Sequence, residues 1–263
     1  MMNKKCSIQY IVLTFSIAYL VSGMLIVLGQ SGYTVYNWVH TFQQFLMNIP
    51  FSIYILSPAI ASYVVLKKNK KVTGLKEWLK TVFYLKNSVF LYLFVTAGLV
   101  LYFGVHIAVL GGVKLALPFY TFFLSIPGGI IIGGLEEAGW MYVLQPEFDK
   151  KYGFVPACVF VGIIWAFWHI PLFFIPGTNH CAGTIHFWMF QIQLMSFSFF
   201  RGAVYRIAGK SYVFVFLLFH TMFNAVSPIF GTMTMTWRGT VAANSVMILF
   251  SIITVMIHNK RKR

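Results

Sequence analysis

Residues Gly133–Pro146 read GGLEEAGWMYVLQP, and this stretch departs more than any other from the apolar sequence around it. It contains Glu136 and Glu137, two of only five acidic residues in a chain of 263. A carboxylate in hydrocarbon is costly, so an acid inside a membrane segment usually has a function and a partner. Two adjacent acids at the end of a long apolar run therefore predict a functional site.

The composition of the whole chain is that of an integral membrane protein. It is 59% hydrophobic and 10% charged, with a mean hydropathy of +0.78, far outside the range of soluble domains. The net charge of +15 comes from short basic clusters between apolar runs, and no basic face or recognition motif indicates nucleic-acid binding. The three cysteines, Cys6, Cys158 and Cys181, show no paired spacing that would indicate a disulfide framework.

The apolar runs predict an all-α bundle of about eight transmembrane helices, forming one membrane domain over residues 1–263. Most runs are close to the ~20 residues that a helix needs to cross a bilayer. The sixth run is the weakest of the set. The runs cover residues 8–29, 46–66, 88–110, 115–135, 154–175, 184–200, 212–230 and 240–257.

Basic residues predict the orientation, because Lys and Arg are retained on the cytoplasmic side. With both termini in the cytoplasm of a cell membrane, all of the 20 basic residues except Lys114 and Arg238 lie on that side. Residues 72–87, between the second and third runs, fit either an amphipathic helix on the inner leaflet or a solvated basic loop.

Two further runs carry polar motifs. The fifth contains Trp165-Ala-Phe-Trp-His169, and the seventh contains His220-Thr-Met-Phe-Asn224. Residues four apart project from one face of a helix. At 1.5 Å of rise per residue, and with the fourth helix continuing to Pro146, these groups and Glu136 reach similar depths in the inner half of the membrane. We therefore expect them to face a single cavity that opens to the cytoplasm.

The order and spacing of these three motifs resemble those of the CAAX protease and bacteriocin-processing enzyme family, also called the Abi family. The resemblance covers roughly residues 115–230. It extends to the sequences around the motifs, GGLEEAGWMYVLQP, IIWAFWHIPLFF and LLFHTMFNA. Three motifs in the same order make the resemblance specific. It implies an intramembrane endopeptidase.

The resemblance also implies roles for the motif residues. Glu136 and His169 would polarise a water molecule that attacks the scissile carbonyl, while His220 and Asn224 would stabilise the oxyanion. A rival mechanism uses zinc as cofactor, since Glu136, His169 and His220 match the ligand types of a catalytic zinc site. The chain has no His-Glu-x-x-His motif, and the sequence leaves both mechanisms open.

Two positions depart from the family pattern. Trp165 stands where the family has Phe, and Met141 stands where it has Arg. An arginine at position 141 would lie four residues after Glu137 and keep that carboxylate ionised. Without it we expect Glu137 to be largely neutral, unless Arg201 or Arg206 replaces the missing cation. Of these two we favour Arg206, because it is closer to the start of the seventh run.

Three classes of function follow. The first is a protease that cuts a peptide or membrane-protein substrate, in bacterial peptide processing or self-immunity to bacteriocins. The second is a catalytically degenerate scaffold or immunity protein, suggested by Met141. The third is a proton-coupled transporter, for which buried acids and histidines are also suited, although the chain shows no evident internal repeat.

Overall fold

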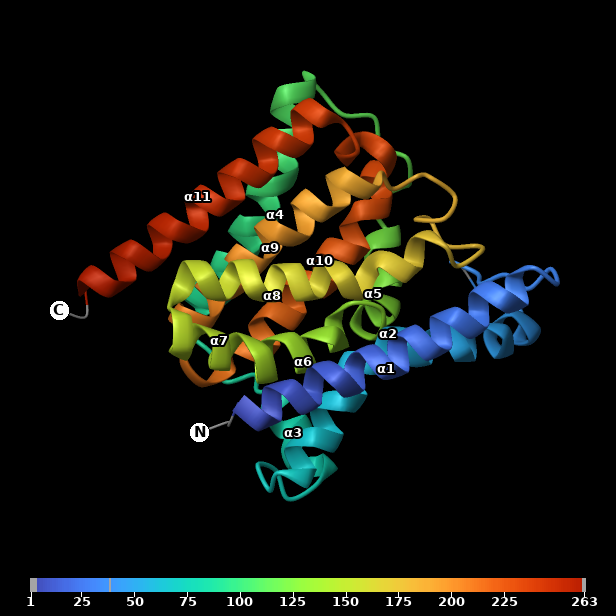
Figure 1. The fold of residues 1–263 in the computed structure, drawn as a ribbon. Coiled ribbons are helices and arrows are strands. Elements are labelled where there is room, and N and C mark those ends of the chain that lie inside the picture. The colour runs from blue at the N-terminus through green and yellow to red at the C-terminus, as the bar shows by residue number, and fades with distance from the viewer. Residues whose placement is uncertain (1–3, 38, 262–263) are drawn as a thin grey trace.

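The computed structural model describes residues 4–37 and 39–261, and in this part of the chain all regular secondary structure is helical, with no strand (Figure 1). The predicted all-α class is confirmed. The α-helices are α1 (Lys4–Gly29), α2 (Phe42–Lys68), α3 (Leu75–Val82), α4 (Val89–Leu110), α5 (Thr121–Ile131), α6 (Glu137–Gly139), α7 (Gln145–Tyr152), α8 (Phe154–His169), α9 (Phe187–Ile207), α10 (Tyr212–Phe230) and α11 (Trp237–Arg261). Short 3₁₀ turns are η1 (Gly134–Glu136), η3 (Ile170–Phe173), η4 (Gly209–Ser211) and η5 (Gly231–Thr234), and η2 (Trp140–Leu144) is a π-helical turn.

Seven helical segments among the described residues are long and apolar enough to cross a membrane. One of them joins α5, η1, α6, η2 and α7 into a single segment, Thr121–Tyr152. The chain is thus a multi-pass membrane protein. The remaining long helix, α9, corresponds to the sixth apolar run and is not among the seven.

The polar content of α9 follows from its place at the centre of the bundle. It packs against α4, α7, α8, α10 and α11, and Gln193, Ser196, Ser198 and Arg201 are buried there. A helix that faces protein on most sides has no need of the apolar surface that a lipid-facing helix requires. With 21 residues, α9 is about 30 Å long. The count of eight spans therefore remains a prediction.

The bundle has two parts, and the motif segment lies between them. The pair α1 and α2 lies in the lower part of the view in Figure 1, above α3, while α4 and α11 lie in the upper part. Both labelled chain ends lie at the left of this view. Turns η1 and α6 contact α2 on one side and α10 on the other. The two glutamates are therefore enclosed between the two parts of the bundle.

Aromatic side chains fasten α2 to α8 beside the motif segment. The ring of Tyr54 stacks on that of Trp168 with centroids 4.9 Å apart, and its hydroxyl donates a hydrogen bond of 2.7 Å to the Trp168 carbonyl. The indole of Trp168 donates to Ser57 over 3.0 Å. These contacts satisfy the polar tips of buried aromatic groups and fix the position of α8.

The fourth run is not one helix, which corrects the expectation that it continues to Pro146. α5 ends at Ile131, and Gly133 has φ +109°, a backbone conformation that favours glycine. The chain then passes through η1 and α6 into the π-helical turn η2. Such wide turns often lie at functional sites, and here the break sets the directions of Glu136 and Glu137.

The segment between α2 and α4 forms the short helix α3, which confirms the helical interpretation of residues 72–87 over its central part. Trp78 and Val82 are buried against the bundle, whereas Leu75 and Leu79 are 52% and 38% exposed. The helix therefore carries apolar side chains both toward the protein and away from it.

Candidate active site

The break before the two glutamates brings the motif segment against α10. A Cβ atom at Gly133 would lie 2.2 Å from Nδ2 of Asn224 and 2.9 Å from Nε2 of His220. Both distances are too short for a side chain at this position, and the φ of +109° also favours glycine. Gly133 thus lets the polar ends of His220 and Asn224 meet the backbone at the break.

Glu136 is 3% exposed, and its Oε2 accepts a hydrogen bond of 3.1 Å from the indole Nε1 of Trp165. A buried carboxylate needs such donors, because it has lost its hydration. The donor comes from α8, the helix that also carries His169 at its last residue. The first two motifs are therefore joined by a direct contact.

Glu137 is completely buried and binds two basic side chains. Nε of Arg201 lies 3.0 Å from its Oε2 and Nη2 lies 3.2 Å from its Oε1, the two-pronged geometry of a strong arginine–carboxylate pair. Nδ1 of His220 lies 2.9 Å from the same Oε1. An ion-paired carboxylate only accepts hydrogen bonds, so Nδ1 of His220 carries a proton and donates. This leaves Nε2 of His220 directed at Gly133.

Of the two candidate cations for Glu137, the structure selects Arg201, which binds it directly. The preference for Arg206 is wrong, because Arg206 pairs with Asp149 over 2.9 Å. Both arginines lie on α9, which continues to Ile207, and Arg206 is therefore about 7.5 Å further along the axis from the site.

Arg201 is held by aromatic rings as well as by Glu137. Its guanidinium carbon lies 4.1 Å from the ring centre of Trp165 and 5.2 Å from that of Phe216, within the range of a cation–π contact. Met141 occupies the position of the family arginine and is fully buried. The cation that the motif lacks is therefore supplied from another helix.

His169 and Asn224 bind backbone carbonyl groups. Nδ1 of His169 lies 2.9 Å from the carbonyl oxygen of Trp165, so this nitrogen donates and Nε2 is the free acceptor of the neutral ring. Nδ2 of Asn224 donates to the carbonyl of Ile132 over 2.7 Å. Ile132 is the residue just before the break, so Asn224 also stabilises that break.

The residue that unites the site is Trp165, a role that the sequence did not reveal. Its ring centre lies 5.2 Å from that of His169 and 5.6 Å from that of His220, its N–H binds Glu136, and its face covers Arg201. The only signal in the sequence was the replacement of the family phenylalanine by a larger residue that also has a donor.

The described residues contain no group of three or more His, Cys, Asp or Glu side chains that could hold a metal ion. Glu136, His169 and His220 surround Trp165 but do not form such a group. In addition, Nδ1 of each histidine is engaged with a protein oxygen. The zinc interpretation gains no support from this geometry.

A family model matches the segment that carries the three motifs. Residues 115–226 match the family model described as Type II CAAX prenyl endopeptidase Rce1-like. No curated protein sequence matches the chain. This match confirms the predicted resemblance over residues 115–226.

Proposed function

We propose that this protein is an intramembrane endopeptidase that cleaves a peptide or membrane-protein substrate with an activated water molecule. The family match supports protease activity. The observation that carries the proposal is the placement of Glu136, His169 and His220 around Trp165. Three motifs far apart in the chain thereby supply an acid and two imidazoles to one buried region.

In this mechanism Glu136 and His169 act on the water. The hydrogen bond from Nδ1 of His169 to the Trp165 carbonyl fixes the tautomer in which Nε2 accepts a proton. The indole of Trp165 fixes one oxygen of Glu136, and the other oxygen is the general base. Such a positioned base contributes about 10²- to 10⁴-fold to a hydrolysis rate.

His220 and Asn224 stabilise the oxyanion that forms on the scissile carbonyl. Nε2 of His220 and Nδ2 of Asn224 lie together against Gly133, and Nδ2 has a second N–H besides the one that binds the Ile132 carbonyl. The Arg201–Glu137 pair orients His220 through Nδ1, and Nε2 donates to the oxyanion when the ring carries a second proton. One oxyanion donor is worth about 10²- to 10³-fold in rate.

The geometry weakens the case for a degenerate scaffold. Met141 was the reason for that interpretation, but Arg201 places a cation on Glu137 from α9. The lost motif arginine is therefore no argument for lost catalysis. The following test distinguishes the protease from a scaffold and from a proton-coupled transporter.

The test compares peptides and membrane-protein fragments released by cells that produce the wild type or Glu136→Gln. This substitution keeps the shape of the side chain but removes the base. Glu147→Gln, on α7, is the matched control because it makes the same change outside the motif contacts. We expect products to disappear with Glu136→Gln alone. Identical products from all three strains would overturn the protease proposal in favour of a scaffold or transporter.

We further propose that the protein lies in a bacterial cell membrane with both termini in the cytoplasm, and that it processes secreted peptides or confers self-immunity to bacteriocins. Cys181 tests the orientation, because it is exposed while Cys6 and Cys158 are buried. A membrane-impermeant maleimide should label intact cells at Cys181 and fail to label a Cys181→Ser variant. Labelling only after cell lysis would reverse the orientation.

A further inference from the structure

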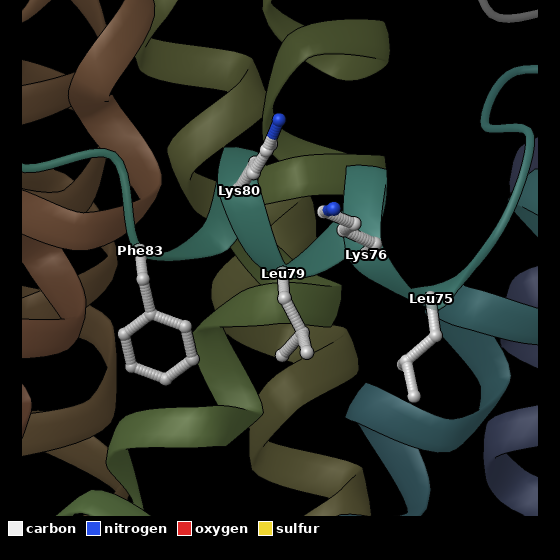
Figure 2. A pocket seen from close by; sticks show the side chains of 5 residues that line it. All are labelled: Leu75, Lys76, Leu79, Lys80 and Phe83. Carbon is white, nitrogen blue, oxygen red and sulfur yellow. The ribbon is translucent and has the colours of Figure 1, made fainter.

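The surface of α3 that faces away from the bundle carries an apolar row beside two lysines. Leu75, Leu79 and Phe83 are four residues apart, and together with Lys76 and Lys80 they line a groove. Figure 2 shows the three apolar side chains pointing the same way, downward in this view, while Lys80 points up. This is the division of an amphipathic helix that lies at a membrane interface.

The helix is fastened to the protein through its other side. The indole of Trp78 donates a hydrogen bond of 3.1 Å to Ser62 on α2, and Val82 is fully buried. Phe83, the half-buried end of the apolar row, contacts Phe214 of α10, with ring centres 6.3 Å apart. The row is therefore held in a fixed position by neighbouring spans.

The charge around this row is strongly positive. Residues 67–86 contain seven lysines and one acid, Glu77. Thr73 donates to Glu77 through its hydroxyl and its backbone N–H, both over 2.7 Å, and these bonds lower the pKa of that carboxyl. The acid is thus turned back to the start of α3, and Lys76 and Lys80 remain exposed.

The apolar surface continues along the chain after α3. Leu85, Val89 and Phe90 are 60%, 69% and 80% exposed, and the last two begin the candidate span α4. The groove therefore leads into a surface that faces hydrocarbon. A second copy of this chain would bring its own lysines against these lysines, which is unfavourable.

We propose that the groove on α3 binds an anionic phospholipid of the surrounding bilayer. The acyl chain lies along Leu75, Leu79 and Phe83, and the headgroup phosphate lies at Lys76 and Lys80. Clusters of four to eight basic residues on an amphipathic helix or beside a span have the charge to attract acidic lipids, at about 1 kcal/mol for each residue near the surface. This inference is independent of the proposed protease activity.

The test measures how strongly the full-length protein retains added phosphatidylglycerol and phosphatidylcholine, by native mass spectrometry from detergent. We expect Lys76→Gln/Lys80→Gln to weaken phosphatidylglycerol retention by about 30-fold, the combined effect of two such charges, and to leave phosphatidylcholine unchanged. Lys260→Gln/Arg261→Gln removes equal charge at the end of α11 and should change neither lipid. Leu75→Gln/Leu79→Gln should weaken both lipids about equally.

Three results would overturn the proposal. The first is unchanged phosphatidylglycerol retention in the α3 lysine variant. The second is an equal loss in the α11 variant, which would mean a nonspecific response to net charge. The third is a dimer that the leucine variant converts to a monomer, which would assign the groove to a second copy of the chain.

Discussion

Two arginines on α9 each bind a carboxylate, and the two pairs differ in surroundings. Arg201 and Glu137 have no exposed side-chain surface, and Glu137 also binds His220. Arg206 and Asp149 are 29% and 7% exposed. Breaking a buried ion pair is costly because the charge that remains is not hydrated. Breaking a pair that is open to water costs much less free energy. Breaking the inner pair is therefore expected to have the larger effect, and the outer pair joins α9 to α7.

The largest expected effect is the loss of one member of the inner pair. Arg201→Gln leaves Glu137 without its cation, and Glu137→Gln leaves a guanidinium in low dielectric. Breaking a buried pair in this way costs about 3–5 kcal/mol. A thiol-reactive dye that reports the exposure of buried Cys6 and Cys158 on heating would measure this loss. An unchanged melting temperature for both variants would mean that the inner pair does not contribute to the stability of the folded protein.

The next effect tests whether Arg201 replaces the family arginine. Met141→Arg alone adds a second cation to a buried site, and Arg201→Met alone removes the arginine that binds Glu137. The double variant should restore activity and melting temperature relative to the single changes. When two residues share a partner, the free-energy effects of substituting them differ from simple addition by about 0.5–3 kcal/mol. Simple addition of the two single effects would contradict the replacement.

Much of the fold followed from hydropathy and charge, because membrane helices must be long, apolar and satisfied within their own backbone. The grouping of the motif residues was harder to predict. Gly133 marks a break that periodicity cannot show, since its role depends on contacts with His220 and Asn224. The pairing of Arg201 with Glu137 depends on how α9 lies beside the motif segment. Such contacts join helices that are distant in sequence, and a single sequence carries no signal for them.

Trp165→Phe should have an intermediate effect that tests the connection between the inner pair and the base. Phenylalanine keeps an aromatic face for Arg201 but removes the N–H that Glu136 accepts. Hydrogen bonds to charged groups are worth about 1.5–3 kcal/mol, or about 10- to 100-fold in kcat/KM. The melting temperature should fall less than for Arg201→Gln. Unchanged activity would show that the indole N–H is dispensable.

The smallest effect is expected for Arg206→Gln, which breaks the outer pair and so provides the direct contrast with the inner pair. Its arginine is partly exposed, so water can hydrate Asp149 once the guanidinium is gone, and we expect about 1 kcal/mol or less. Activity should be unchanged, because Asp149 lies on α7 and touches none of the motif residues that surround Trp165. Added salt should shrink the difference from wild type further, since screening weakens exposed pairs more than buried ones. A loss of activity equal to that of Arg201→Gln would instead place both arginines in one connected network, and burial would then no longer distinguish the inner pair from the outer one.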